Sequence, residues 1–432
     1  MFKNSRVAKS VKLAMILGAS AAAITSVPAF SAEEEAVEEV ERIEVTGSRI
    51  QRTDMETSVP ITVIGRSDML EMGALNVADV LNSSPIAIAG SDQSNTSFTN
   101  SGVGLNTTQL RGLGDARTLV LVNGRRFVSG VSPSVGYAVD LNAIPTSMIE
   151  RIEILKSASS AIYGSDAVAG VINIITRTGF DGVEFVAHTG TSAESDRDKL
   201  ALNVTAGGSW DTGSVTMAIG YDEDDGLKSS DRDFSEFDEA IIHDENGNEI
   251  VGIVNSSYPP QGRVGGYNGD GTEFEGSTLD GFNRASYRQL VTPLERKYAA
   301  FNFKQELSDS VEYFSEVNWN SSKTNDSTIE PTPFNTNDVY LPERGGTGGI
   351  SMINPMVPQL LHDNLIADGY TDADNIPAMV RRMVEFGARS TDLERSTIRV
   401  VNGVDWNIDD NWTLNAYVSW GKTDQQQDNG GQ

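Results

Sequence analysis

The sequence predicts a small α+β domain, a mixed sheet with short helices, followed by an antiparallel transmembrane β-barrel that is incomplete within the 432 residues. Between Ile144 and Arg177, two β-type segments flank a short run of small residues. From Val183 onward, segments of about ten residues carry apolar side chains at alternate positions, as expected when one face of a strand meets lipid and the other a polar lumen.

The segment from Ile149 to Leu155 alternates apolar and charged residues. A period of two is typical of a strand with one buried face. We therefore expect Ile152 and Ile154 to be buried, and Arg151 and Glu153 to face away.

A short helical turn and a second strand follow. Ser157 to Tyr163 is rich in small residues, and Gly164 can end the turn because glycine adopts positive φ without steric cost. Val171 to Thr176 is almost continuously apolar and β-branched, which indicates a strand covered on both faces.

Other elements of the small domain can be placed in chain order. Ile61 to Ile64 is a predicted strand, and Asn76 to Asn82 is a helical turn capped by its asparagine. Thr118 to Val122 is an apolar strand that meets Asn123-Gly124, a strong hairpin signal, and returns through Arg125 to Val128.

A first barrel strand is predicted at Val183 to Gly190, and six more segments bring the total to seven. The apolar positions of these six segments are Leu200, Leu202, Val204 and Ala206; Val215, Met217, Ile219 and Tyr221; Ala299, Phe301 and Phe303; Val311, Tyr313, Val317 and Trp319; Ile398, Val400, Val404, Trp406 and Ile408; and Trp412, Leu414, Ala416, Val418 and Trp420.

Turn lengths predict the orientation of the barrel. Tight turns are expected at Asp211 to Gly213, Ser308 to Ser310 and Asp409 to Asn411. Outer-membrane barrels have short periplasmic turns and long outer loops, so the loops near 223–295 and 323–393 should be extracellular.

Seven strands cannot close a barrel of even strand number, and an open edge leaves backbone groups unpaired in lipid. The sequence ends in the polar run DQQQDNGGQ, without a terminal aromatic strand. We expect the N-terminal part of a longer protein; a shorter barrel of another kind is the alternative.

The N-terminus has the pattern of a secretory signal peptide. Basic residues precede an apolar segment from Leu13 to Ile24, and small residues follow it. A membrane anchor is the alternative, but a helix needs roughly 20 apolar residues to span a bilayer. Residues 1–32 are therefore assigned to the signal peptide, and residues 33–50 to an acidic leader.

Composition argues against several classes of function. The formal net charge of −28 disfavours nucleic acid as a partner. There is no cysteine, and the three histidines, His188, His243 and His362, lie far apart in the sequence. We predict no catalytic residue, metal site or cofactor; the acidic surroundings of His243 could suggest calcium or another metal, but a solvated acidic loop is the simpler interpretation.

Three ordered motifs resemble TonB-dependent outer-membrane receptors. They are RIEVTGSRI (Arg42 to Ile50), LRGLGDARTLVLVNGRRF (Leu110 to Phe127) and IERIEILKSASSAIYGSDAVAGVINIITR (Ile149 to Arg177). The resemblance implies a plug domain at 51–180, followed at 181–432 by the N-terminal part of the barrel.

The resemblance also implies site residues. Ile43, Glu44, Val45, Thr46 and Gly47 would contact TonB. A short β-prone segment suits strand addition to a partner's sheet edge; the alternative is that it forms the first residues of the plug.

Two plug arginines complete the set of implied site residues. Arg111 and Arg151 align with the arginines that pair with barrel glutamates in this family. The alternative is that both are ordinary surface arginines.

The implied function is energised uptake of a scarce ligand such as a siderophore, cobalamin or an oligosaccharide. The implied partners are the TonB energy-transducing complex of the inner membrane, outer-membrane lipid and a small-molecule or oligomeric ligand. The implied location is the outer membrane of a Gram-negative bacterium after signal-peptide cleavage. A surface ligand-binding protein without active transport, or a nonfunctional truncated product, remains an alternative.

Overall fold

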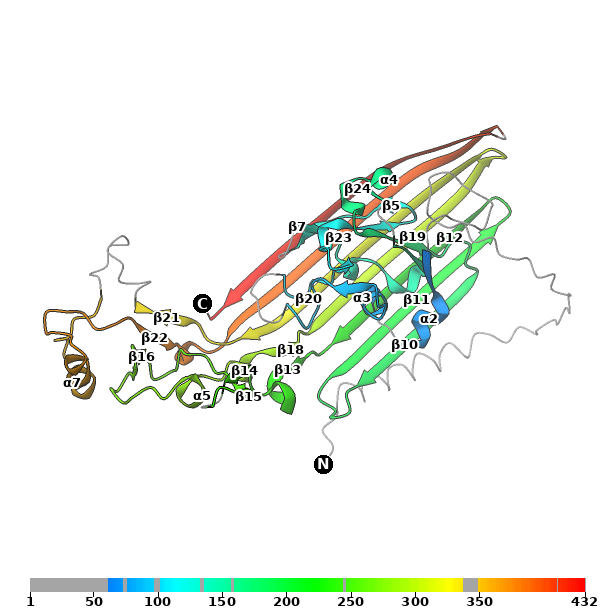
Figure 1. Cartoon of the computed structure of the whole chain (residues 1–432). Coiled ribbons are helices and arrows are strands. Elements are labelled where there is room, and N and C mark those ends of the chain that lie inside the picture. The colour runs from blue at the N-terminus through cyan, green and yellow to red at the C-terminus, as the bar shows by residue number, and fades with distance from the viewer. Residues whose placement is uncertain are drawn as a thin grey trace, which may run out of the picture.

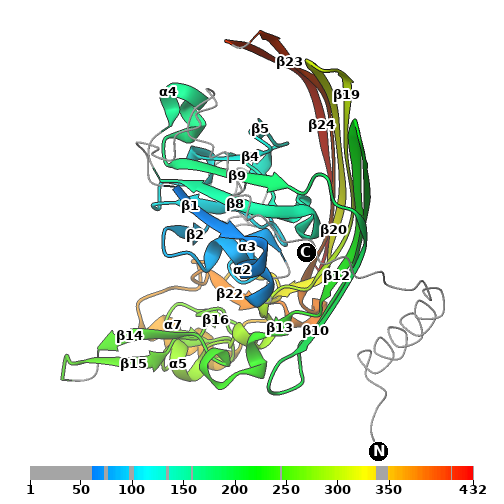
Figure 2. The same ribbon diagram turned by 90° about the vertical axis from the view of Figure 1, so that its right-hand side faces the viewer.

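A curved antiparallel sheet forms the largest part of the molecule, and a smaller mixed domain lies against its concave face (Figures 1 and 2). The computed structural model describes residues 61–72, 76–96, 102–132, 136–156, 159–243, 246–336, 349–409 and 411–431. In these ranges no helix is long and apolar enough to cross a membrane.

The curved sheet, here called the barrel sheet, contains the seven predicted strands, each antiparallel to its neighbour. In sheet order they are β10 (Gly182–Thr191), β11 (Asp198–Trp210), β12 (Gly213–Asp224), β19 (Leu294–Ser308), β20 (Val311–Ile329), β23 (Arg389–Asp409) and β24 (Trp412–Gly430). Strands β10 and β24 are the two edges and do not pair with each other, so the barrel is open.

Side chains alternate across the barrel sheet as the sequence predicts. In β12, Thr216 and Ala218 are buried on the inner face, whereas Met217 and Ile219 are 47% and 61% exposed on the outer face. The outer face is therefore apolar, as a surface in contact with lipid requires.

The three predicted tight turns are present. Trp210 pairs with Gly213, Ser308 with Val311, and Asp409 with Trp412 at the ends of consecutive strands. The second long loop is shorter than predicted, because β20 extends to Ile329 and β23 begins at Arg389. The added residues of β20 and β23 are mostly polar and pair with each other. The predicted strand ends were placed at the ends of the apolar segments, so they fell short.

The plug domain is built on a five-stranded mixed sheet in the order β1-β8-β9-β4-β5. Strands β4 and β9 are parallel, and the other pairs are antiparallel. The strands are β1 (Ile61–Gly65), β4 (Thr118–Val122), β5 (Arg125–Arg126), β8 (Ile149–Leu155) and β9 (Gly170–Thr176). The helices are α2 (Arg66–Glu71), α3 (Val77–Asn82) and α4 (Ser160–Tyr163), and the hairpins are β2 (Ala87–Ala89) with β3 (Thr108–Leu110) and β6 (Gly130–Ser132) with β7 (Gly136–Ala138).

The plug core lies around β8 and β9, where Ile152, Ile154, Ile172 and Ile174 are fully buried. Glu153 was predicted to face away from these isoleucines, and its side chain is nevertheless fully buried. Strand β8 lies between β1 and β9, and a second apolar cluster packs beside the same sheet. Glu153 therefore points into protein, whereas Glu150 is exposed and Arg151 is partly buried.

Two local predictions are confirmed at atomic detail. The Asn76 side chain accepts a hydrogen bond from the Asp79 backbone N–H at the start of α3. Asn123 and Gly124 have φ of 51° and 72° between β4 and β5. Positive φ at both positions is the geometry that favours Asn-Gly in tight hairpins.

The described parts of the two long loops share one sheet, here called the loop sheet, in the order β17-β16-β22-β21. Strands β16 (Arg263–Val264) and β17 (Tyr267–Asn268) come from the first loop, and β21 (Pro333–Asn335) and β22 (Met379–Arg382) from the second. Helix α7 (Gln359–Ala367) packs beside it through Leu361 and Leu365, in one cluster with Val264 and Met352.

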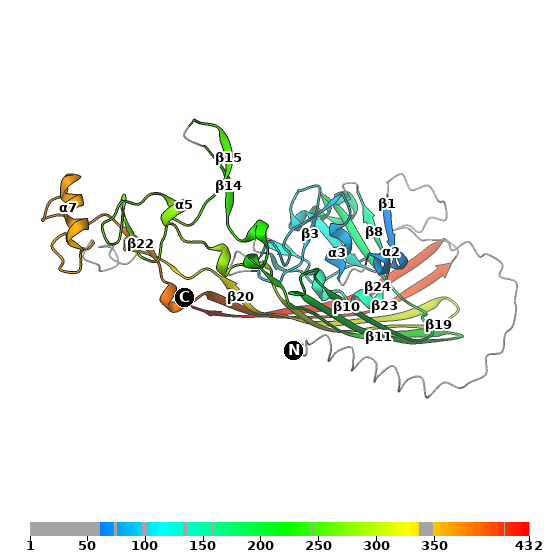
Figure 3. The ribbon, with the colours of Figure 1, turned by 90° about the horizontal axis from the view of Figure 1, so that it is seen from below.

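The first loop contains further short elements. These are β13 (Leu227–Lys228) with β18 (Gln289–Val291), the hairpin of β14 (Glu239–His243) and β15 (Glu249–Ile253), and α5 (Ser277–Asp280). The β14–β15 hairpin projects away from the barrel sheet (Figure 3).

Candidate functional site: the contact between plug and barrel sheet

The turn between β4 and β5 carries two polar side chains to the inner face of the barrel sheet. Arg125 Nη1 lies 2.9 Å from Glu316 Oε1, and Asn123 Nδ2 donates a hydrogen bond to the same oxygen at 2.9 Å. Glu316 lies within β20 and its side chain is only 8% exposed. The hairpin that the Asn-Gly pair makes possible thus places a plug cation against a buried barrel carboxylate.

The second oxygen of Glu316 binds an arginine of the barrel sheet itself. Arg399 Nη1 lies 2.8 Å from Glu316 Oε2, and the Arg399 side chain is fully buried. The Arg125 guanidinium also stacks 3.9 Å from the Phe314 ring centroid. Glu316 therefore compensates the charges of the partly buried Arg125 and the fully buried Arg399. We call Asn123, Arg125, Phe314, Glu316 and Arg399 the Glu316 cluster.

A second contact lies around η2 (Leu141–Ala143), a short 3-10 turn of the plug. Asp140 Oδ2 is 3.1 Å from Arg395 Nη1, and both side chains are buried. The Asn142 carbonyl accepts hydrogen bonds from Asn320 Nδ2 at 2.9 Å and from Arg296 Nη1 at 3.3 Å. Three barrel strands, β19, β20 and β23, thus hold this turn.

A third contact lies at the edge strand β10. Glu184 pairs with Arg66 of α2 and with Arg177, whose Nη1 is 3.2 Å from Glu184 Oε1. These side chains are partly exposed, so this contact is more hydrated than the Glu316 cluster. Together, the three contacts join the plug to the barrel sheet from β10 to β23.

The two predicted arginines, Arg111 and Arg151, are not among the residues of the three contacts described above. Arg111 is exposed and has φ of 58°. Arg151 Nε is 2.9 Å from Glu153 Oε1, and its Nη1 is 2.9 Å from Glu150 Oε1, so these two partners lie in its own strand. The pairing of Arg111 and Arg151 with barrel glutamates therefore stays a prediction. Ile43, Glu44, Val45, Thr46 and Gly47 lie outside the described residues.

Sequence reasoning did not identify Arg125, Glu316 or Arg399 as site residues. A signal was present, because Glu316 and Arg399 fall in the inward rows of β20 and β23. A charged residue at an inward strand position needs a partner when it is buried. This pattern identifies Glu316 and Arg399 as candidates, but it does not show which plug residue contacts them.

The different environments of Arg111 and Arg151 predict different mutant phenotypes. Arg151→Ala removes a charged donor from the fully buried Glu153, and should lower the free energy of unfolding of the full-length protein by about 2–3 kcal/mol. Arg111→Ala removes an exposed side chain and should change it by about 0.5 kcal/mol or less. Thermal unfolding in detergent, with antibiotic sensitivity of cells as a measure of leakage, checks both. If Arg111→Ala destabilises as much as Arg151→Ala, then Arg111 has a buried partner.

The fold and these contacts define a plugged-barrel protein, with a mixed plug domain held inside a curved antiparallel sheet. Residues 53–171 match the family described as TonB-dependent Receptor Plug Domain. This part of the chain is therefore similar to the plug domains of TonB-dependent receptors.

Several solved receptors are similar to the chain. A ferric enterobactin receptor mutant from Pseudomonas aeruginosa, in complex with enterobactin, has 14% identity and a TM-score of 0.48, with 84% of this chain and 41% of that chain covered. The ferric preacinetobactin receptor BauA from Acinetobacter baumannii has 11% identity and a TM-score of 0.41, with 86% and 48% covered. The siderophore receptor PirA from Acinetobacter baumannii has 14% identity and a TM-score of 0.36, with 85% and 48% covered. The chain spans less than half the length of each of these receptors.

Proposed function

We propose that the chain is the N-terminal part of a TonB-dependent outer-membrane receptor that takes up a scarce ligand with energy supplied through TonB. The observation that carries the proposal is the set of ion pairs and hydrogen bonds that hold the plug against the inner face of the barrel sheet. A domain in that position obstructs the lumen, so passage of a ligand requires the plug to move. The open edges β10 and β24 support the view that further strands complete the barrel.

In this proposal residues 1–32 direct export and are removed, and the mature protein lies in the outer membrane of a Gram-negative bacterium. Ile43 to Gly47 contacts TonB by strand addition. The long loops, which carry the loop sheet, face outward and receive the ligand. Its class remains open among siderophores, cobalamin, oligosaccharides and similar molecules.

Deletion of Ile43 to Gly47 from the full-length receptor tests the proposal. Energised uptake by cells should stop, whereas binding of the ligand to the cell surface should persist, because the deleted segment lies far in sequence from the loops. Uptake that continues in the deletion variant would favour the alternative, a surface ligand-binding protein without active transport. A product that reaches the membrane only as the 432-residue chain and neither binds nor transports would be a nonfunctional truncated product.

A further inference from the structure

A cavity of about 420 Å³ lies where the two long loops meet. It is lined by residues of the first loop (Asn255, Ser256, Ser257, Tyr258 and Arg284), by residues of the second (Glu330, Pro333 and Arg382) and by Arg389, the first residue of β23. Cavities of roughly 300–1,000 Å³ suit small organic molecules. The cavity is distinct from the contact between plug and barrel sheet.

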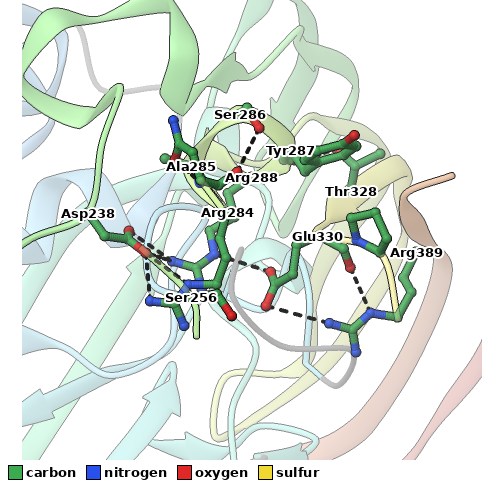
Figure 4. Close-up of polar contacts among 12 residues, drawn as sticks. Asp238, Ser256, Arg284, Ala285, Ser286, Tyr287, Arg288, Thr328, Glu330 and Arg389 are labelled. Atoms are coloured by element: carbon green, nitrogen blue, oxygen red, sulfur yellow. Dashed lines mark hydrogen bonds and ion pairs between the residues drawn. The ribbon is translucent and has the colours of Figure 1, made fainter. Parts of the chain in front are cut away.

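Positive charge exceeds negative charge around this cavity. Arg284 Nη2 lies 2.6 Å from Asp238 Oδ2, and Arg288 bridges Asp238 and Glu330 at 3.1 Å and 3.3 Å. Arg389 Nε donates to the Glu330 carbonyl at 2.8 Å. Figure 4 shows Arg284 directed at Asp238, and Arg389 at Glu330.

The fourth arginine, Arg382, is almost fully buried, at 4% exposure. Its Nη1 donates to the Pro331 carbonyl at 2.9 Å and its Nη2 to Ser256 Oγ at 3.0 Å. Its contact with a carboxylate, Glu330 Oε1, is 3.9 Å long, and among the described residues its Nε has no hydrogen-bond partner. A buried guanidinium with so little compensation is costly unless an anion completes its surroundings.

The charges can be summed. Arg284, Arg288, Arg382 and Arg389 carry four positive charges, and Asp238 and Glu330 carry two negative charges, which leaves two positive charges. Burial lowers the pKa of Arg382, and Glu330 raises it. Repulsion from Arg389, Arg284 and Arg288 lowers the pKa further, so the net direction is down. If these arginines only connected the two loops, equal numbers of positive and negative charges would be enough. A positive surplus is the more unexpected because the chain as a whole has a net charge of −28.

We propose that this cavity binds a small organic anion with at least two carboxylate groups. Two carboxylates balance the surplus charge, and arginine forks match carboxylates in bidentate geometry. Tyr258 and Pro333 line the same cavity and provide an apolar wall for the body of the ligand. The proposal deepens the proposed function and rests on it for the location of the loops, since it names a chemical class for the ligand that they receive.

The test is titration calorimetry of the purified full-length receptor in detergent with citrate, inorganic phosphate and sucrose as probes. Citrate should bind and weaken as salt rises, phosphate should bind less tightly, and sucrose should not bind. Arg389→Gln should weaken citrate binding by about tenfold or more, since it removes one charged donor. The control is Arg381→Gln in β22, because Arg381 does not line the cavity and pairs with Glu385 at 3.1 Å.

A second variant distinguishes a site that binds an anion from arginines that only hold the two loops together. Glu330→Gln keeps the side-chain shape and raises the surplus to three positive charges, so it should tighten citrate binding several-fold. A purely structural role predicts the opposite, since Glu330→Gln would then loosen the loops as Arg389→Gln does. Absence of citrate binding to the unaltered receptor, phosphate binding tighter than citrate, or weaker citrate binding by Glu330→Gln would each overturn the proposal.

The result is independent of coupling to TonB. The variant that lacks Ile43 to Gly47 should bind citrate with unchanged affinity in detergent, even though it does not transport. Loss of uptake with retained citrate binding supports both proposals. Normal uptake in the deletion variant contradicts only the energised transport, and absent citrate binding contradicts only the anion site.

Discussion

Glu316→Ala is expected to destabilise the full-length receptor by about 3–5 kcal/mol, because it leaves the buried charges of Arg125 and Arg399 without their carboxylate. The plug should also loosen, since Arg125 and Asn123 of the plug both bind Glu316. Thermal unfolding in detergent measures the first effect, and sensitivity of cells to large antibiotics measures the second.

Glu312→Ala is the matched control in the same strand. Glu312 pairs with Lys304 at 3.2 Å, but both side chains are substantially exposed, so its loss should cost about 1 kcal/mol or less. A double-mutant cycle with Arg125→Ala isolates the part of the effect that crosses from plug to barrel. Equal losses in Glu312→Ala and Glu316→Ala, or additive effects in the cycle, would show that the Glu316 cluster does not hold the plug.

Val45→Pro is expected to abolish import by the full-length receptor while leaving ligand binding at the outer loops intact. Strand addition depends on backbone N–H groups in an extended conformation. Proline at this position removes one donor and restricts Glu44 as well. Uptake of labelled ligand by energised cells, compared with binding at low temperature, checks the prediction.

Two comparisons make the Val45 result specific. Proline at Glu35 lies in the acidic leader, where no pairing is expected, and transport should survive. Glu44→Ala should matter little, because backbone groups rather than this side chain carry the pairing. Normal import by Val45→Pro would indicate that this segment does not pair with TonB and only forms the first residues of the plug.

The barrel strands could be predicted because lipid and lumen impose opposite preferences on successive residues. The alternate apolar residues Val215, Met217 and Ile219 indicate a strand with one apolar face. The tight turns followed from the same pattern, since few residues separate the apolar rows. The ends of β20, β23 and β24 were missed, because beyond the apolar segment a strand can pair without apolar residues.

The buried state of Glu153 could not be predicted from alternation. A period of two shows which face of a strand is apolar, but it does not show what covers the other face. In the plug, Glu153 lies opposite the fully buried Asn173 of β9 and binds Arg151 of its own strand. Burial of Glu153 therefore depends on packing between segments, which a local pattern does not contain.

The candidate site was predicted least well, for a related reason. The Asn-Gly turn predicts a hairpin at Asn123, but not that its tip touches β20. The pairing of Val264 with Met379 in the loop sheet likewise joins residues far apart in the sequence. Both contacts follow from the course of the chain in three dimensions rather than from local composition.

The polar character of the contact between plug and barrel sheet has a mechanical consequence. Among the described residues, a small apolar cluster of Met148 with Ala218 and Ala300 joins them. Other contacts are ion pairs and hydrogen bonds, such as those of Asn142 with Asn320 and of Asn302 with Thr176. Water can replace each hydrogen bond at a net cost of about 0.5–1.5 kcal/mol. A pulling force would therefore meet a series of separate polar contacts, and the buried ion pairs of Glu316 with Arg125 and of Asp140 with Arg395 would resist it most.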